Sequence, residues 1–305
     1  MSHPSRTRPV RRFDWLAGTI FLGPCLAALA VVAVVPAGFA IFGSFFDWHF
    51  HRPEAREFIG IGNYAELVND GRFLRSLGVT GLYTVTSVLA TLVLGFLLAL
   101  LVKHPFPGKN AARALLTIPM IMTPVVSTLV FKTFFFEADL GLVNWVLDAF
   151  GVNGPAWIAR SPYALISILI VNIWFMTPFV FLILDASLSS FPEDVIDAAR
   201  IDGASYWQRV GFVILPMLRG VLVFTLFFRI TIDFRMFDII QVMTGGGPAR
   251  DTEVLSLWVY STALRNFQVG YGNAGAVVMM VAVGIVCLAI LLLGTRGGAG
   301  RLGSK

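Results

Sequence analysis

The sequence predicts an all-α integral membrane protein with six transmembrane helices, and two observations support this prediction. Hydrophobic residues make up 57% of the 305 positions and charged residues only 13%, whereas soluble domains carry about 25% charged residues, which keep their surfaces hydrated. The apolar residues also gather into six runs. Each run reaches the roughly 20 residues that cross about 30 Å of hydrocarbon, and none alternates in polarity as barrel strands do.

Short loops separate the six predicted spans, so no second domain is expected. Residues 1–15 and 295–305 are predicted to be tails of a single transmembrane domain that covers residues 16–294. The first run is about twice as long as the apolar core of a signal peptide, which predicts a retained anchor. The predicted spans are Leu16 to Phe45, Leu77 to Val102, Leu115 to Phe136, Tyr163 to Leu184, Val221 to Met243 and Ala274 to Leu293.

The Lys and Arg residues are distributed unequally between the two sides of the predicted bundle. Of the 23 such residues, 13 lie on the side that holds both termini, seven lie on the opposite side and three lie within spans. Cytoplasmic loops are enriched in Lys and Arg, so both termini are predicted to be cytoplasmic. The net charge of +5 does not indicate nucleic-acid binding, because the basic residues form no continuous stripe.

The cysteines, histidines and glycine-rich stretches predict a chain with no metal, no cofactor and no catalytic residue of its own. Cys25 and Cys287 lie in apolar runs and the four histidines lie outside them, so no intramembrane pair is available to ligate haem or a redox metal. The stretches at 108–110 and 303–305 lack the pattern of a phosphate-binding loop. Work driven by ATP would therefore need a second chain that hydrolyses it.

The cytoplasmic loop of residues 188–220 differs from the other loops because it is predicted to fold. Ser190 followed by Glu193 predicts a capping box, and Pro192 suits the first helical turn. A short helix is therefore expected over residues 191–201. Gly203 then permits the left-handed turn that ends it.

A second helical piece, expected from Ser205, leads back to the membrane at Leu215-Pro216. The small residues Ala198 and Ala199 allow another surface to approach the first helix closely. Charged side chains nearby can fix the register of such a contact: Asp194, Asp197, Arg200 and Asp202. An interfacial helix resting on lipid is the alternative, but its acidic beginning would be repelled by anionic headgroups.

The run Asp197-Ala-Ala-Arg-Ile-Asp-Gly203, followed after nine residues by Val213-Ile-Leu-Pro216, resembles the signature of ABC importer permeases. That family writes it as Glu-Ala-Ala, three residues, Gly, nine residues, Ile-x-Leu-Pro. Asp197 replaces the Glu and Val213 the Ile, while the remaining signature positions match. In that family the loop carries a coupling helix that fits a groove of the cytoplasmic ATPase. The resemblance implies the same role for residues 194–203, and we call residues 188–220 the coupling loop.

Two further runs, Phe237 to Pro248 and Thr252 to Leu255, resemble the carbohydrate-uptake branch of these permeases, which includes maltose-type and glycerol-phosphate-type transporters. The resemblance covers nearly the whole chain and implies the type I ABC importer permease fold in a bacterial cytoplasmic membrane. It implies two ATPase subunits that use ATP with Mg²⁺, an extracytoplasmic solute-binding protein and a substrate that is a sugar, a polyol or glycerol phosphate. A second permease subunit, forming a heterodimer, is also expected, and a homodimer stays open.

The fifth predicted span contains four charged residues, which are costly in hydrocarbon. Arg229 and Asp233 are spaced i, i+4 and Arg235 and Asp238 i, i+3, so each cation is predicted to pair along the helix. The two pairs lie on different faces. Each pair either locks helices together or contacts the substrate, and Arg229 raises the hypothesis of an anionic substrate.

The fourth predicted span adds polar and aromatic groups about halfway across the membrane, and Pro178 loosens its backbone. Ordinary helix packing with a proline kink is the alternative. Lys132, near the outer end of the third span, is expected to reach water. The candidate substrate path consists of Asn172, Trp174, Thr177, Arg229, Asp233, Arg235 and Asp238.

Two other classes of protein are weighed against an importer subunit. A membrane-embedded enzyme would need a His, Cys or carboxylate cluster at a wet interface, and the sequence offers none. A secondary transporter would have no use for a folded acidic helix on the cytoplasmic face, and no inverted repeat is evident. The outer Gly245-Gly-Gly-Pro248 stretch is interpreted as a re-entrant or docking turn.

Overall fold

The computed structural model describes residues 12–51, 54 and 56–296, and it confirms a helical membrane architecture with only two short strands. Within these residues, five helical stretches are long and apolar enough to cross a membrane singly, and a bent helix pair supplies a sixth candidate span. Four of the single spans lie in α1 (Arg12–Gly43), α3 (Gly71–Lys103), α7 (Tyr163–Ser189) and α13 (Val269–Arg296). The remaining one, Tyr206–Asp233, consists of α9 (Tyr206–Arg209), η2 (Val210–Ile214) and α10 (Leu215–Asp233) as one continuous stretch. The bent pair consists of α4 (Lys109–Ile121) and α5 (Pro124–Val130), which continues into a π-helical turn, η1 (Phe131–Phe135).

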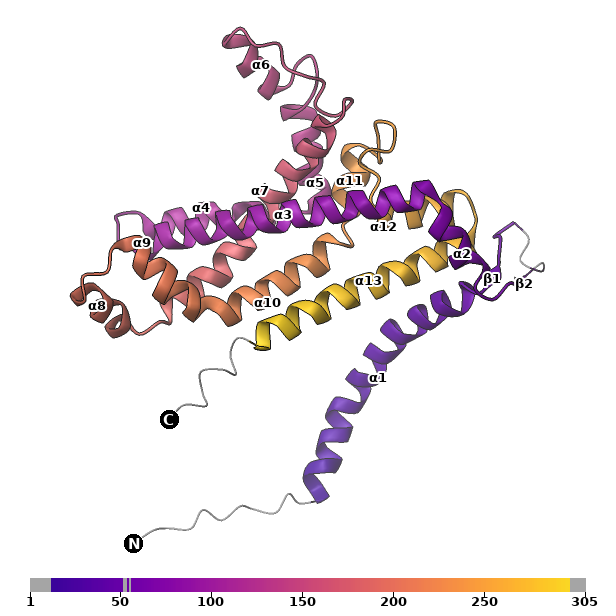
Figure 1. Ribbon diagram of the computed structural model, residues 1–305, viewed down its shortest axis with the longest axis horizontal. Coiled ribbons are helices and arrows are strands. Elements are labelled where there is room, and N and C mark those ends of the chain that lie inside the picture. The colour runs from indigo at the N-terminus through magenta and orange to yellow at the C-terminus, as the bar shows by residue number, and fades with distance from the viewer. Residues whose placement is uncertain (1–11, 52–53, 55, 297–305) are drawn as a thin grey trace.

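Shorter elements connect the spans at both ends of the bundle (Figure 1). Toward the right of the view lie β1 (Phe46–Asp47), β2 (Glu57–Phe58), α2 (Gly62–Asn69) and α12 (Leu255–Tyr260), which continues into η3 (Ser261–Arg265). Helix α6 (Leu142–Ala149) lies apart at the top of the view, and α11 (Asp238–Met243) lies beside α5. At the left end lie α8 (Glu193–Ile201) and α9, which is followed by η2. The two strands pair antiparallel, with Phe46 opposite Phe58.

Helices α3 and α7 pack along each other and form the centre of the bundle. They approach closely at Gly95, where an added Cβ would lie 2.6 Å from a methyl carbon of Val180. Small residues allow such approach between membrane helices. Buried apolar side chains continue this contact toward the α8 end, where Leu100 of α3 and Leu184 and Leu188 of α7 join a cluster with the start of α10.

The third span is broken, so the expectation of one continuous helix from Leu115 to Phe136 is wrong. Helices α4 and α5 meet at 98°, and Thr123 between them has an extended backbone with ψ 149°. Pro124 explains the break, because proline donates no backbone N–H and disfavours helical geometry in the residue before it. The Thr123 hydroxyl accepts from the N–H of Val126 and caps the new helix.

The fifth span is also interrupted, and the expected helix from Val221 to Met243 is wrong at both ends. Helix α10 begins earlier, at Leu215, and ends at Asp233, and α11 begins only at Asp238. No proline or glycine marks the break in the sequence. A tertiary contact stabilises it, because the hydroxyl of Ser256 on α12 donates to the Met236 carbonyl at 2.5 Å.

Helix α1 leaves the bundle and packs against α13 near the strand end (Figure 1). At Gly43 the two helices are so close that an added Cβ would lie 2.4 Å from the Asn273 side chain. Asn63 of α2 donates to the Ser44 carbonyl at 2.8 Å and ties this corner together. The free end of α1 and the last turn of α13 both point toward the α8 end.

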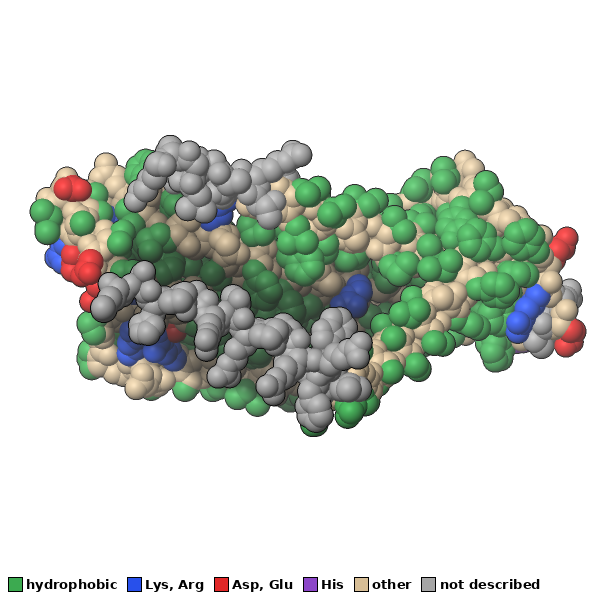
Figure 2. Space-filling view, turned by 90° about the horizontal axis from the view of Figure 1, so that it is seen from below, with side chains coloured by type: hydrophobic (Ala, Val, Ile, Leu, Met, Phe, Trp, Pro, Cys, Tyr) green, Lys and Arg blue, Asp and Glu red, His purple; other side chains and the backbone are tan. Residues whose placement is uncertain are grey.

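The flank shown in Figure 2 has the surface that a membrane span requires. Hydrophobic side chains cover most of its visible described part, and the acidic side chains lie at the two ends. Many of the exposed large hydrophobic residues belong to α1, α3 and α13. A surface of this kind is stable in contact with lipid, whereas its exposure to water would cost free energy.

Candidate coupling loop and intramembrane polar cluster

The first helix of the coupling loop, α8, begins at Glu193 and ends at Ile201. The predicted capping box and the start at residue 191 are wrong, because Pro192 is the N-cap residue and no side chain caps the helix. The Ser190 hydroxyl instead donates to the Ser187 carbonyl at 2.8 Å. Ser190 therefore belongs to the last turn of α7, where carbonyls lack intrahelical partners.

The predicted left-handed turn and second helical piece are confirmed. Gly203 has φ +81°, and the N–H of Ala204 donates back to the Ala199 carbonyl at 3.0 Å. A capping box does form, but at the start of α9. There the N–H of Gln208 donates to the Ser205 hydroxyl, and the N–H of Ser205 donates to the Gln208 side chain at 2.8 Å.

Helix α8 is exposed over most of its surface, including one continuous stripe. Asp194, Asp197, Ala198 and Ile201 follow the i, i+3, i+4, i+7 spacing of a single helix face, and no residue of α8 is buried. Ala199 is half-buried on another face, whereas Arg200, Asp202 and Gly203 are exposed. The stripe is thus free to contact another molecule.

Two apolar residues that sequence reasoning missed extend this surface. Ile201 is 85% exposed and Trp207 is 68% exposed. The sequence could have indicated both residues, because they are large and apolar and lie at the end of a short charged helix and just after it. Exposed aromatic side chains are enriched at the centres of protein–protein interfaces.

The coupling loop is anchored to the bundle through residues that follow α9. Val210, Ile214 and Leu218 are buried at 4% exposure or less and pack against α3 and α7. These contacts fix the segment after α9 to α3 and α7. Leu215 and Pro216 lie on a different surface. There they line a cavity of about 660 Å³ together with Leu92 of α3 and further residues of α10.

Inside the membrane, four side chains from three helices form a polar cluster: Ser87 of α3, Asn172 of α7, and Arg229 and Asp233 of α10. Nη2 of Arg229 donates to Asp233 at 2.7 Å and to the Ser87 hydroxyl at 3.1 Å. Asn172 donates to Ser87 at 2.6 Å and contacts Asp233 at 3.4 Å. All four are buried, so the predicted pairing of Arg229 with Asp233 is confirmed.

The polar cluster retains unused hydrogen-bonding capacity. Within the described part of the chain, Nε and Nη1 of Arg229 and Oδ1 of Asn172 have no partner, and neither does the hydroxyl of Tyr83. Tyr83 precedes Ser87 by one turn of α3, so its side chain shares that helix face. Buried polar groups usually find partners, and these atoms offer donors and an acceptor to water or to a hydroxyl-bearing ligand.

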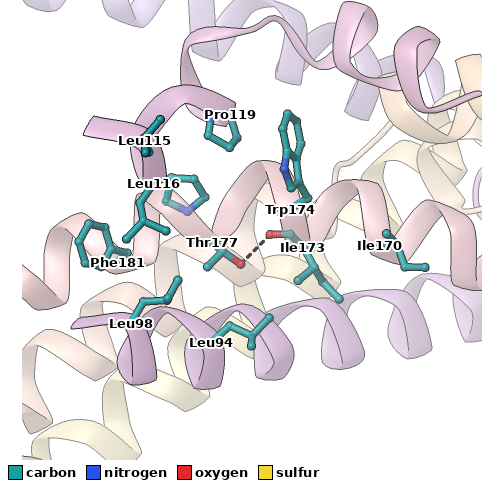
Figure 3. A pocket seen from close by; sticks show the side chains of 11 residues that line it. Leu94, Leu98, Leu115, Leu116, Pro119, Ile170, Ile173, Trp174, Thr177 and Phe181 are labelled. Carbon is teal, nitrogen blue, oxygen red and sulfur yellow. Dashed lines mark hydrogen bonds between the residues drawn. The ribbon is translucent and has the colours of Figure 1, made fainter. Parts of the chain in front are cut away.

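Trp174 and Thr177 do not join the polar cluster. At 100° per residue, Trp174 points about 200° away from Asn172, toward an apolar cavity between α3, α4 and α7 (Figure 3). The hydroxyl of Thr177 is already used, because it donates to the Ile173 carbonyl at 2.6 Å. The fourth-span residues of the candidate path therefore occupy two separate sites.

Arg235 and Asp238 are not paired, contrary to prediction. Both are exposed, no ion pair joins them, and Nε of Arg235 donates to the Thr231 carbonyl at 3.1 Å. The break after Asp233 removes the helical spacing on which the pairing depended. Lys132 also departs from expectation, because its amine donates to the Val242 carbonyl of α11 at 2.8 Å rather than only reaching water.

Hydrogen bonds and ion pairs hold the Gly245-Gly-Gly-Pro248 turn in place. The Thr252 hydroxyl donates to the Gly247 carbonyl at 2.7 Å. Arg72 of α3 binds Glu253 through two nitrogens, with Nε to Oε2 at 2.9 Å. The turn is thus a defined surface at the end of the bundle opposite α8.

Residues 91–296 match the protein family described as binding-protein-dependent transport system inner membrane component. The sulfoquinovosyl glycerol transport system permease protein of Agrobacterium fabrum is 33% identical over 276 residues, covering 90% of this chain and 89% of that protein. The trehalose/maltose transport system permease protein of Thermococcus litoralis is 32% identical over 282 residues, covering 90% and 92%.

A solved structure shares the fold. It is the crystal structure of a bacterial alginate ABC transporter in complex with a periplasmic protein bound to alginate pentasaccharide. One of its chains matches with a TM-score of 0.76 and 21% identity, covering 93% of this chain and 94% of that chain. The likeness confirms the predicted permease fold.

Proposed function

Because the chain belongs to the family of binding-protein-dependent transport system inner membrane components, we propose that it carries a carbohydrate or a related polyol through an ABC importer. The chain is a multi-pass permease subunit and not an enzyme. One observation carries the proposal beyond the family: α8 is exposed along a whole face, while the residues after it are buried between α3 and α7. That arrangement suits a lever between a soluble motor and a membrane path.

The proposed motor is a pair of ATPase subunits that bind ATP with Mg²⁺ and receive α8 in a groove. The stripe formed by Asp194, Asp197, Ala198 and Ile201 is the proposed contact, and Gly203 sets the angle between α8 and α9. Closure of the ATPases would move the coupling loop as one body, because Val210 and Ile214 fix it to the bundle. The spans would then alternate access to a site between them.

The remaining partners are proposed from the family and from charge. A solute-binding protein would dock on the face that carries the Gly245-Gly-Gly-Pro248 turn, and a second, different permease subunit would complete the path as a heterodimer. The α8 end and both termini would lie in the cytoplasm of a bacterial cell, because the basic residues predominate there.

The polar cluster is the proposed substrate contact, through Asn172, Arg229 and Asp233. Its unused donors and acceptor suit sugar hydroxyls, and the relatives above are named for the transport of sulfoquinovosyl glycerol and of trehalose or maltose. Asp233 compensates the charge of Arg229, which favours a neutral substrate over the hypothesised anionic one. Uptake of one neutral and one anionic sugar by the Arg229→Ala variant tests this proposal. If only uptake of the anionic sugar is lost, the substrate is anionic rather than neutral. If uptake of both sugars is unchanged, Arg229 does not contact the substrate.

The lever is tested by affinity purification of the tagged chain from its native host, with mass spectrometry of what co-purifies. We expect an ATPase and a second membrane protein with the wild type, and loss of the ATPase alone with Gly203→Pro, since proline cannot adopt a positive φ. Gly151→Pro is the matched control, because Gly151 has φ +74° at the opposite end. Recovery of the wild-type chain without an ATPase would contradict the proposed lever.

A further inference from the structure

The apolar cavity that contains Trp174 has a volume of about 500 Å³, which is within the range of small-molecule sites. Its walls come from three membrane-spanning segments, with α4 on one side, α3 on the other and α7 between them (Figure 3). The bend between α4 and α5 lies one turn beyond Pro119, at the end of the α4 wall. The lining residues include Leu94, Leu98, Leu116, Pro119, Trp174 and Phe181.

The cavity interior offers almost nothing to a sugar. The one hydroxyl in its lining, that of Thr177, is bound to the Ile173 carbonyl, and the other residues except Trp174 are purely apolar. A sugar placed there would lose its hydrogen bonds to water without replacement, which is costly. An alkyl chain would lose nothing and would fill a void that otherwise forfeits packing contacts.

A cation stands at the end of this cavity that faces α8. Nη2 of Arg113 on α4 binds Asp185 on α7 at 2.9 Å. Arg113 lies three residues before Leu116, and Asp185 lies four residues after Phe181, so the ion pair is one helical turn beyond the cavity wall. The Arg113 side chain is 33% exposed.

Arg113 has a donor to spare. Among the described residues, Asp185 binds only Nη2 of its guanidinium, and the side chain is 33% exposed, so further N–H groups are accessible to a ligand. A guanidinium with an unused N–H is a strong site for a phosphate oxygen. Arg113 is only four residues from the start of α4, close to the depth at which the headgroups of one leaflet lie.

We propose that this cavity binds one acyl chain of an anionic phospholipid, whose phosphate accepts from Arg113. The lipid would enter from the leaflet on the α8 side. Its acyl chain would pack against α4, the first half of the bent span, and fill the space between α4, α3 and α7. This site is separate from the polar cluster and does not depend on which substrate is carried.

Native mass spectrometry of the purified transporter tests the cavity by counting retained phosphatidylglycerol. The wild type should keep one tightly bound lipid per copy of this chain. The double variant Leu94→Phe and Leu98→Phe narrows the cavity and should lose it. Leu97→Phe with Leu101→Phe is the matched control, since these α3 residues are exposed at 45% and 69% and do not line the cavity. Equal retention by both double variants would overturn the proposal.

The headgroup contact is tested by two substitutions with opposite expected effects. Arg113→Gln should lower the affinity for phosphatidylglycerol by about tenfold, the loss of one charge-assisted hydrogen bond to its phosphate. Asp185→Asn leaves Arg113 without its internal partner and should maintain or increase that affinity. If the ion pair only clamps α4 to α7, both variants would lower lipid retention alike, which would contradict the assignment.

A fluorescence measurement separates a lipid from a protein segment as the occupant. Phosphatidylglycerol with brominated acyl chains should quench the emission that is lost in Trp174→Phe, measured on the complete transporter in nanodiscs. Quenching that disappears in the Leu94→Phe and Leu98→Phe variant supports the lipid. Unquenched Trp174 emission in the wild type would mean that another protein surface fills the cavity, and the proposal would fail.

Discussion

The coupling loop and the polar cluster use the same residue types with opposite physical consequences. In α8, the aspartates and Arg200 are exposed, so water hydrates them and their mutual attraction contributes little to stability. In the polar cluster, Arg229 and Asp233 are 0% and 1% exposed, so each needs the other. Charge in the coupling loop is therefore available for a partner, whereas the two charges in the cluster neutralise each other and leave only uncharged hydrogen-bonding capacity, at Nε and Nη1 of Arg229 and Oδ1 of Asn172, for a ligand.

The two regions also differ in what anchors them. The coupling loop depends on backbone features, namely the positive φ at Gly203 and the capping box at Ser205. The polar cluster depends on side chains that converge from three helices. Substitutions should accordingly damage function in the loop while sparing the bundle, and damage the bundle when made in the cluster.

The largest expected effect is in the polar cluster. Asp233→Ala leaves Arg229 buried without its counterion and should lower the free energy of unfolding by about 3–5 kcal/mol. Denaturant titration in detergent measures this. The double variant Arg229→Met with Asp233→Leu removes both charges and should recover most of the loss. A double variant as unstable as the single one would show that the cluster is not held by its ion pair.

A smaller effect is expected at the turn of the coupling loop. Gly203→Ala forces a non-glycine residue into the left-handed region, at a local cost of about 1–3 kcal/mol. Backbone strain is the source of this cost, because an added Cβ meets no other atom there. Substrate uptake should fall, while the denaturant midpoint of the bundle stays near that of the wild type. Gly151→Ala carries the same backbone strain away from the loop, and reduced uptake in that variant too would argue against a specific coupling role.

The capping residues give an effect of about 1 kcal/mol. Ser205→Ala removes the hydroxyl that accepts from the N–H of Gln208 and should lower the local stability of α9 by about that amount. Hydrogen exchange of the α9 amides would measure this change. Ser190→Ala should leave exchange in α8 unchanged, because Ser190 does not cap that helix. Faster exchange in α8 after Ser190→Ala would restore the capping box that the sequence predicted.

The smallest effect on stability is expected at the exposed stripe. Ile201→Ser should change the free energy of unfolding by less than about 0.5 kcal/mol, yet it should weaken the proposed ATPase contact, measured as the ATPase retained after dilution of the complex. Leu140→Ser is the control, because Leu140 is 88% exposed and lies remote from α8. Unchanged ATPase retention in Ile201→Ser would remove Ile201 from the interface.

Local signals predicted much of the coupling loop. The spacing from Asp197 to Gly203 and on to Pro216 identified the helix, the turn and the return to the membrane, because a positive-φ glycine acts within a few residues. Pro124 could have predicted the break in the third span, and its effect was missed because the apolar run continues across it. The capping box was placed at Ser190 rather than Ser205, since both positions satisfy the pattern and only the length of α7 decides between them.

The sequence by itself determined that this chain crosses a membrane, roughly where its six apolar segments lie, and which loop carries the signature of its family. Those properties follow from composition and short-range spacing. Only the tertiary structure decided that α10 ends at Asp233, that Asn172 meets Arg229 while Trp174 faces an apolar cavity, and that Arg235 stays unpaired with Asp238. These outcomes depend on contacts between residues as far apart as Ser87 and Arg229, and a helical period cannot specify which neighbour each face will meet.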